Sequence, residues 1–351
     1  MSVVTDPPTS AATHKATDAL YVSRNERLAL PGRRTLAYSH SGPPDSRLVV
    51  LWCHGGFNFG DAMNTPQAFR DRKVHFIAPD LPGWGETSPM PAGTTFPEVL
   101  LSDLRVLFEH LYPACHVAAS ALRIYVAGVS DGTCAAQVVC GAPYDSFPYG
   151  RQMVAMLLVE PLVQFCEDVH YSRSLTWAAW VCVGPPAHIL PFNLVARMLK
   201  YATQPHLKDV PSAEKTLRAD IIGKMAKDEK VAFAEWRARA GVQEGEFVRW
   251  MAERMVRSVS KSWAGLLGMA DVLHADWGFK IKDLDEDHAR KKVIMIVARG
   301  QTKTLDYLVK NYRNTKVVEV AGGDLVGAWC MDLIWEETFA ELESEGGLPS
   351  A

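Results

Sequence analysis

The stretch Ile124-Tyr-Val-Ala-Gly-Val-Ser130-Asp-Gly132-Thr-Cys-Ala-Ala-Gln-Val-Val139 decides the fold. An apolar run rich in β-branched residues leads into a G-x-S-x-G motif, and a run of small residues with helical character follows it. The motif therefore predicts a sharp strand-to-helix turn at Ser130, where the flanking glycines let the backbone bend and expose the serine hydroxyl. A hydroxyl in that position can act as a nucleophile. The pentapeptide alone also occurs in glycine-rich turns with an incidental serine, so the surrounding sequence must carry the prediction.

Two further motifs lie upstream, each after a predicted buried strand. The run 47–53 ends in His54-Gly55-Gly56-Phe57, and the run 74–79 ends in Asp80-Leu-Pro-Gly-Trp-Gly-Glu-Thr-Ser88. The three motifs, in this order, resemble those of the α/β-hydrolase superfamily: H-G after one strand, D-x-P-G-x-G-x-S after the next, and then the nucleophile turn. The resemblance covers residues 26–160, with a weaker return from 291 onward. It implies the α/β-hydrolase fold.

The order of the predicted elements agrees with a mainly parallel, doubly wound sheet covered by helices on both faces. We expect an initial hairpin over 27–39 and a helix from Leu325. Buried strands are predicted at Leu48–Trp52, His75–Ala78, Arg123–Ala127, Met153–Val159, Lys292–Ala298 and Thr315–Val320. Between 160 and 262 the pattern changes to helical periods with clustered charges, which predicts a helical cap inserted into the sheet.

These patterns divide the chain into four segments. We expect a disordered N-terminal tail over 1–20, a first part of the core over 21–162, the helical cap over 163–265, and a second part of the core over 266–351. The tail is rich in Ser, Thr, Ala and Pro and has no apolar segment of the kind found in secretory signals.

Composition narrows the functional classes. The chain has 351 residues, of which 48% are hydrophobic and 22% charged, and a formal net charge of −3. That charge gives no bulk attraction to nucleic acid or to anionic membranes. The seven cysteines are scattered without metal-ligand spacing, which favours reduced thiols in the cytoplasm. No apolar run is long enough to span a bilayer. We expect neither a cofactor nor a metal; the oligomeric state stays open.

The resemblance implies specific roles for the residues of the motifs. Ser130 would be the nucleophile, and the amide of Asp131 would form an oxyanion hole together with the amide of Gly56 or Phe57. His54 and Gly55 belong to the same loop of the site. His54 is more often a structural hydrogen-bonding residue than a base in this position.

The histidine and the acid of the expected catalytic triad are missing. In this family the histidine follows the last strand in a glycine-rich loop, and the matching loop here is Val320-Ala-Gly-Gly-Asp324, with aspartate in its place. No histidine occurs after His288. The loop that would supply the acid carries Lys303 at the matching position. Some members of the family take the acid from the strand before the cap, where Glu160 stands in this chain.

Both remaining carboxylates have alternative interpretations. A buried aspartate that faces a serine has a raised pKa and can act as a base, so Asp324 is a candidate catalytic residue. The alternative is that Asp324 is a relic in a site that only binds ligand. Glu160 either lines the site or binds nearby backbone amides at the end of its strand. If another base serves Ser130, His274 and His288 are the first candidates.

Bulky apolar residues in the cap suggest the substrate class. They are Phe165, Trp177, Trp180, Trp236, Trp250, Met251, Met255 and Trp263. If they line the site, they favour a small lipophilic substrate; the alternative is that they only dock the cap on the core. We therefore predict an enzyme acting on a small, mainly apolar ester or carbonyl compound. Two alternatives are a non-hydrolytic lyase, isomerase or cyclase of secondary metabolism, and a catalytically silent ligand-binding protein.

Overall fold

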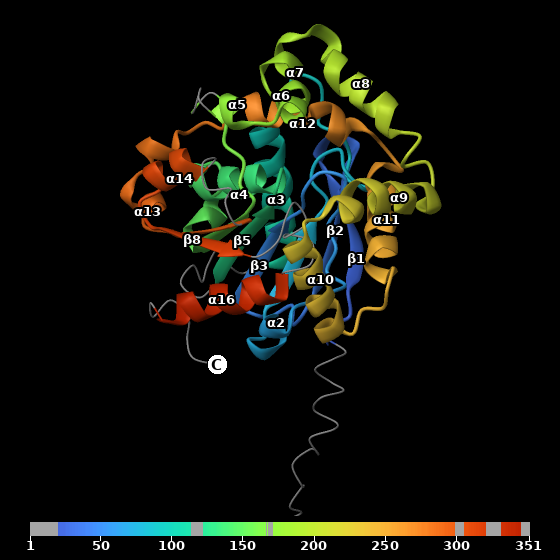
Figure 1. The fold of residues 1–351 in the computed structure, drawn as a ribbon. Helices are drawn as coiled ribbons and strands as arrows, with labels where there is room; N and C mark the ends of the chain where they lie inside the picture. Colours follow the sequence, from blue (N-terminus) through green and yellow to red (C-terminus); the bar gives the residue numbers. More distant parts are fainter. Residues whose placement is uncertain are drawn as a thin grey trace, which may run out of the picture.

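An eight-stranded sheet forms the centre of the computed structural model, which describes residues 20–113, 122–165, 167, 171–298, 305–320 and 331–344 (Figure 1). The strands are β1 (Arg24–Leu30), β2 (Arg34–Ser41), β3 (Leu48–Cys53), β4 (His75–Pro79), β5 (Arg123–Val129), β6 (Met153–Val159), β7 (Lys292–Ala298) and β8 (Thr315–Val320). Their order across the sheet is β1-β2-β4-β3-β5-β6-β7-β8. β2 pairs antiparallel with β1 and β4, and all other neighbours are parallel. The predicted fold class and the predicted strands are confirmed.

The parallel register brings the carboxyl ends of the central strands to one edge of the sheet. Cys53 at the end of β3 pairs with Gly128 of β5, and Val129 of β5 pairs with Val159 at the end of β6. The loops that follow these three strands carry the H-G motif, the G-x-S-x-G motif and Glu160. Sites in open α/β sheets form at this edge, so the topology itself brings the predicted site residues together.

Helices cover both faces of the sheet because the strand side chains alternate between two apolar cores. One core includes residues of α3 (Phe96–Leu111) and α4 (Gly132–Gly141). The other includes residues of α2 (Gln67–Asp71) and α16 (Met331–Ser344). In α16 the ring of Phe339 is fully buried, with its centroid 5.8 Å from that of Phe69.

Between β6 and β7, the described residues form helices joined by turns and loops, with no strand among them. Its α-helices are α5 (Tyr171–Ser174), α6 (Trp177–Val183), α7 (Pro185–Ile189), α8 (Leu194–Thr203), α9 (Val210–Thr216), α10 (Lys227–Ala240), α11 (Glu246–Val259), α12 (Ala264–His274) and α13 (Glu286–Ala289). Figure 1 shows α6, α7, α8 and α12 together at one end of the molecule, and α12 contacts the other three. The proposed cap boundaries at 163 and 265 stay a prediction.

Several predicted features lie outside the described residues. They are the tail apart from Leu20, the loop with Lys303, the glycine-rich loop with Asp324 and the start of the last helix at Leu325. α14 (Asp306–Asn311) follows the first of these loops. Among the described cysteines, four are free thiols: Cys53, Cys134, Cys140 and Cys182.

Candidate active site

Ser130 occupies a tight turn between β5 and α4. Its backbone has φ = 50°, a left-handed conformation that a residue with a side chain rarely adopts. Two hydrogen bonds stabilise this conformation: the Ser130 amide donates to the carbonyl of Val159 at 2.9 Å, and the Thr133 amide donates to the carbonyl of Ser130 at 2.9 Å. The side chain is half-buried and lines a pocket at the carboxyl edge of the sheet. Such strain is typical of functional positions, because the surrounding structure must maintain it.

The glycines of the motif are explained by close backbone contacts. A Cβ atom on Gly128 would lie 2.3 Å from the carbonyl oxygen of Gly132, and one on Gly132 would lie 2.1 Å from the carbonyl oxygen of Cys53. α4 can therefore begin directly against the ends of β3 and β5 only if both positions lack a side chain. This packing fixes the position of Ser130 relative to the H-G loop.

A hydrogen bond of His54 joins the H-G loop to the D-x-P-G-x-G-x-S loop that follows β4. Its Nδ1 donates to the carbonyl of Gly55 at 2.8 Å, and its Nε2 accepts from the amide of Leu81 at 2.9 Å. Burial lowers the pKa of His54 to about 4, so the ring is neutral at pH 7. With both nitrogens engaged, His54 acts as a structural hydrogen-bonding residue. Asp80 has a similar structural role, because its carboxylate accepts from the amides of Gly60 and Glu86 at 2.7 and 2.8 Å.

The expected oxyanion hole contains a carboxylate. The side chain of Asp131 accepts a hydrogen bond from the amide of Gly56, one of the two donors that the resemblance implies. A Cβ on Gly56 would lie 2.6 Å from Asp131 Oδ2, so the two residues are in close contact. Burial raises the pKa of Asp131 to about 6. At neutral pH a negative charge therefore binds the Gly56 amide, which leaves the Phe57 amide as the alternative donor for an oxyanion.

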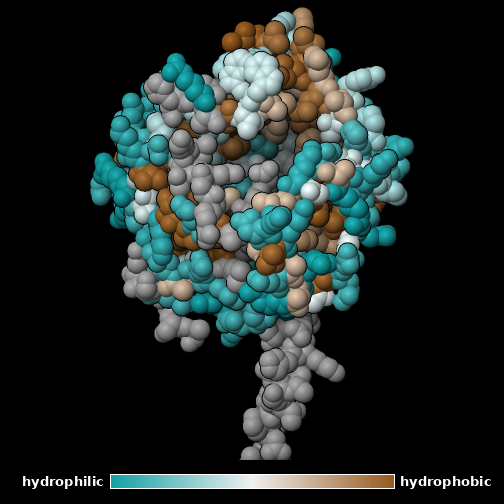
Figure 2. Space-filling view, in the orientation of Figure 1, coloured by the Kyte–Doolittle hydropathy of each residue, from teal (hydrophilic) through white to brown (hydrophobic). Residues whose placement is uncertain are grey.

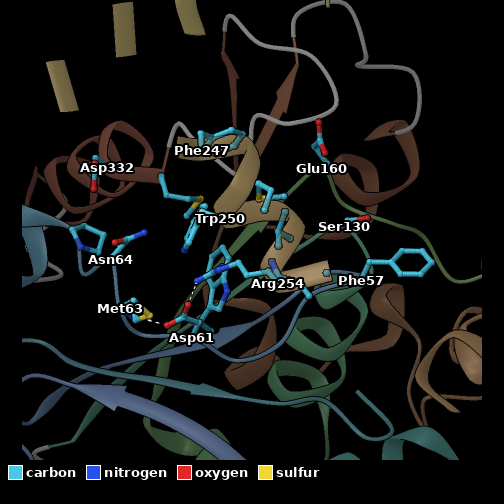
Figure 3. Close-up of a pocket in the computed structure, with 18 of the residues that line it drawn as sticks. Phe57, Asp61, Met63, Asn64, Ser130, Glu160, Phe247, Trp250, Arg254 and Asp332 are labelled. Atoms are coloured by element: carbon cyan, nitrogen blue, oxygen red, sulfur yellow. Dashed lines mark hydrogen bonds and ion pairs between the residues drawn. The ribbon is translucent and has the colours of Figure 1, made fainter. Parts of the chain in front are cut away.

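Glu160 lies next to Ser130 at the end of β6. Its backbone is also left-handed, with φ = 52°, and its amide donates to the carbonyl of Ile296 at 2.8 Å. Because the Ser130 amide bonds to the residue just before Glu160, the two strand ends are adjacent, and both residues line the same pocket (Figure 3). The strand register thus places the backbone of Glu160 next to that of Ser130.

The pocket has a volume of about 730 Å³ and a largely apolar wall. α10 and α11 provide one side, α16 and the H-G loop provide others, and Ser130 lies at the sheet edge. Its apolar and aromatic residues are Trp52, Phe57, Met63, Pro66, Phe76, Val129, Trp236, Ala240, Val242, Phe247, Trp250, Met251, Met269, Met331 and Trp335. A volume of this size fits a small organic molecule, since ligand pockets typically measure about 300–1,000 Å³.

An ion pair in the pocket wall joins α11 to the loop that follows β3. Arg254 on α11 pairs with Asp61 of the H-G loop, and its guanidinium lies 4.0 Å from the centroid of the Trp250 ring (Figure 3). Burial lowers the pKa of Arg254 from its ordinary value, whereas the nearby Asp61 carboxylate raises it. The sequence did not reveal the ion pair with Asp61; the i,i+4 spacing of Trp250 and Arg254 indicates only that these two residues share one face of the helix.

The structure brings most of the predicted site residues together. Gly55, Gly56, Phe57, Ser130, Asp131 and Glu160 all line the pocket. Asp324 lies outside the described residues, so its role stays a prediction. Among the described residues no histidine lines the pocket.

His274 and His288, the alternative candidates for the base, form hydrogen bonds with backbone carbonyl groups outside the pocket. Nε2 of His274 donates to the carbonyl of Val183 at 3.1 Å, and Nε2 of His288 donates to the carbonyl of Ala142 at 3.0 Å. Neither histidine lines the pocket.

The apolar residues predicted to line the site divide into three groups. Trp236, Trp250 and Met251 line the pocket. Phe165, Met255 and Trp263 instead pack in or against the apolar core that includes α3 and α4. Trp177 stacks on Trp180, away from the pocket lining.

No family model matches the sequence, and no curated protein matches it. Solved structures do match the fold. An esterase from Thermogutta terrifontis, with malate bound, is 15% identical over 92% of this chain and 98% of its own, with a TM-score of 0.54. An epoxide hydrolase from Vigna radiata is 13% identical over 92% and 98%, with a TM-score of 0.56. A hydrolase from Pseudomonas aeruginosa PA01 is 13% identical over 91% and 98%, with a TM-score of 0.51.

The chain therefore has the α/β-hydrolase fold over nearly its whole length. Two properties of the described residues accompany this fold. None of their helices is long and apolar enough to cross a membrane. They also contain no group of three or more His, Cys, Asp or Glu side chains arranged to hold a metal ion.

Proposed function

We propose that this protein is an enzyme that acts on a small, mainly apolar ester or carbonyl compound, with Ser130 as the residue that attacks or polarises its carbonyl group. The observation that carries the proposal is the left-handed turn at Ser130, which faces a pocket with aromatic walls. A strained serine at the carboxyl edge of an α/β sheet has no evident structural use, because Gly or Asn would adopt its backbone conformation at lower cost.

The pocket wall supports an apolar substrate. Trp236, Phe247 and Trp250 form one aromatic surface: the ring centroids of Trp236 and Phe247 are 5.6 Å apart, and those of Phe247 and Trp250 are 5.9 Å apart. An acyl chain or an aromatic ring on this surface would share the pocket with Ser130. A polar group buried against this aromatic surface would lose its hydrogen bonds to water, which is costly.

Hydrolysis at this site requires a proton acceptor for Ser130. When the hydroxyl oxygen bonds to the ester carbon, its proton passes to a base; the alcohol then leaves with a proton, and water releases the acyl group. Glu160 is the candidate base among the described residues because it adjoins Ser130 in the pocket. Asp324 is the other candidate that the sequence supplies.

A second candidate function is a non-hydrolytic proton transfer, such as that of a lyase or an isomerase. The observation that favours it is the Asp131 carboxylate on the Gly56 amide. This arrangement disfavours a tetrahedral oxyanion at neutral pH, while a carboxyl group with a pKa of about 6 is suited to moving protons near neutrality. In this alternative Ser130 would hold the substrate oxygen by a hydrogen bond.

The proposal is tested with a series of p-nitrophenyl esters of increasing acyl length. We expect slow turnover that depends on Ser130 and rises with acyl length until the chain fills the pocket. Ser130→Ala should abolish it, whereas Ser146→Ala, an exposed serine outside the pocket, should not change it. Trp250→Ala should shift the preferred acyl length because removal of the Trp250 ring enlarges the pocket.

Two outcomes would count against the proposal in different ways. Turnover that survives Ser130→Ala would show that the serine carries no chemistry. If no ester is turned over but apolar carbonyl compounds bind with an affinity that Trp250→Ala weakens, the pocket serves a non-hydrolytic reaction or binding alone.

A further inference from the structure

The outer surface of the cap exposes an unusual number of large apolar side chains. Seven of the thirteen exposed large hydrophobic residues in the described chain lie between 177 and 201. Six of them define what we call the cap apolar face: Trp177, Ile189, Phe192, Leu194, Met198 and Tyr201. Figure 2 shows brown side chains gathered at the top of the view, over α6, α7 and α8. Contiguous apolar surface of this kind marks an interaction site.

The backbone at the centre of this face keeps its side chains pointing outward. Phe192 and Asn193 both adopt left-handed conformations, with φ = 60° and 53°, in the short turn between α7 and α8. Phe192 is 84% exposed there, and Tyr201 on α8 is equally exposed. At this exposure the Phe192 ring gains little from packing within this chain, which favours an external partner as the reason for an aromatic residue in a strained turn.

The charge of the same segment points to the kind of partner. Residues 177–201 contain Arg197 and Lys200 but no aspartate or glutamate, and the nearest acidic residues along the chain are Asp168 and Asp209. The cap segment is therefore locally basic in an acidic protein. One carboxylate from outside the segment, Asp271 on α12, faces His188 at 3.9 Å. A basic apolar surface is typical of segments that lie on anionic membranes.

We infer that the cap apolar face docks on the surface of an anionic lipid bilayer. Phe192, Ile189 and Met198 would enter the boundary between headgroups and acyl chains, where tryptophan and tyrosine also prefer to lie. Arg197, exposed on α8, would contact lipid phosphates. A second copy of this chain is a poorer partner, because two basic faces without acidic residues would repel each other. The inference rests on the cap surface alone and does not depend on the chemistry of Ser130.

The test is co-sedimentation of the full-length protein with vesicles of phosphatidylcholine alone and of phosphatidylcholine mixed with phosphatidylserine. We expect binding to the mixed vesicles and weaker binding to the neutral ones. Phe192→Ser should reduce binding to both. Arg197→Glu should reduce binding to the mixed vesicles only, by more than roughly fivefold, because each basic residue near an anionic surface contributes about that factor.

Matched controls come from other exposed positions. Val231→Ser on α10, where the valine is 58% exposed, and Lys282→Glu in an exposed turn should bind as the wild type does. Absence of binding to either vesicle would overturn the inference, as would equal losses in Phe192→Ser and Val231→Ser. A dimer in sedimentation velocity that Phe192→Ser dissociates, without vesicle binding, would also overturn it and assign the face to self-association.

Discussion

Asp131 is the residue with the most direct consequence for the chemistry of the site. It follows the candidate nucleophile, and its carboxylate binds the Gly56 amide across the H-G loop. Its pKa of about 6 places its charge change close to neutral pH. Below that value Asp131 is neutral, so the site loses the negative charge that opposes an oxyanion; above it, the charge is present. Under the proposed function, we therefore expect the ionisation of Asp131 to set the pH dependence of ester turnover.

A pH profile tests this role of Asp131. Ester turnover by the wild type should rise as the pH falls through about 6, until the base itself becomes protonated. Asp131→Ala should lack this transition and should exceed the wild type at about pH 8 by roughly tenfold or more, since one oxyanion donor contributes about 10²–10³ in turnover. Asp131→Asn, which removes the charge but keeps an acceptor, should lie between the two.

The opposite result has a clear meaning. If Asp131→Ala loses activity on the native substrate at every pH while remaining folded, Asp131 carries the proton of a non-hydrolytic reaction. Superimposable pH profiles of the wild type and Asp131→Ala would contradict both roles.

Individual site residues were predictable where a motif fixes the backbone. Ser130, Gly56 and Asp131 line the pocket as expected because glycine spacing and strand order determine their positions. The contact between the Asp131 side chain and Gly56 was not predictable, since it depends on how closely α4 packs against the H-G loop. The Arg254–Asp61 pair was missed for a similar reason, because its partners lie 193 residues apart.

At the scale of elements, the junction of β5 and α4 depends on the absence of side chains. Gly132→Ala should destabilise the protein because its Cβ would lie 2.1 Å from the carbonyl oxygen of Cys53, so β3 and α4 must separate. Gly268→Ala within α12 is the matched control: its Cβ would meet only the flexible end of Met90 at 3.5 Å. Alanine there should raise the free energy of unfolding by about 0.5–1 kcal/mol, as expected in a helix interior.

Urea unfolding measures both substitutions. We expect a loss of at least about 2 kcal/mol in Gly132→Ala, in the range of overpacked core positions. Equal stability of Gly132→Ala and the wild type would show that the contact between α4 and β3 is looser than described. Gly132→Ala should also lower ester turnover, since the same contact positions Ser130.

Strands were easier to predict than helices. β7 and β8 begin and end at the predicted residues because each is a continuous apolar or alternating run. The helices of the insertion were predicted only as a class, because short amphipathic segments interrupted by prolines do not fix their own ends. The insertion packs through tertiary contacts, such as those of α12 with α6, α7 and α8, that no local pattern contains.

At the scale of the whole molecule, the fold separates two surfaces with different properties. The sheet edge and helices α10, α11 and α16 surround a pocket with Ser130. The helices α6 to α8 present the basic cap apolar face to the outside. The fold class followed from the order of three motifs. Each motif lies after a strand, and the crossover connections between parallel strands are almost always right-handed, so few arrangements of the sheet are possible. The reaction did not follow, because the same fold supports several chemistries.

The central claim is that Ser130 is a reactive residue in this pocket, and covalent labelling tests it most directly. A fluorophosphonate probe is incubated with the protein, and the modified peptide is identified by mass spectrometry. We predict slow labelling confined to the peptide that contains Ser130 and absent in Ser130→Ala, because no described histidine activates the serine. Labelling of Ser130→Ala to the same extent, or no labelling of Ser130 while other residues react, would contradict the account.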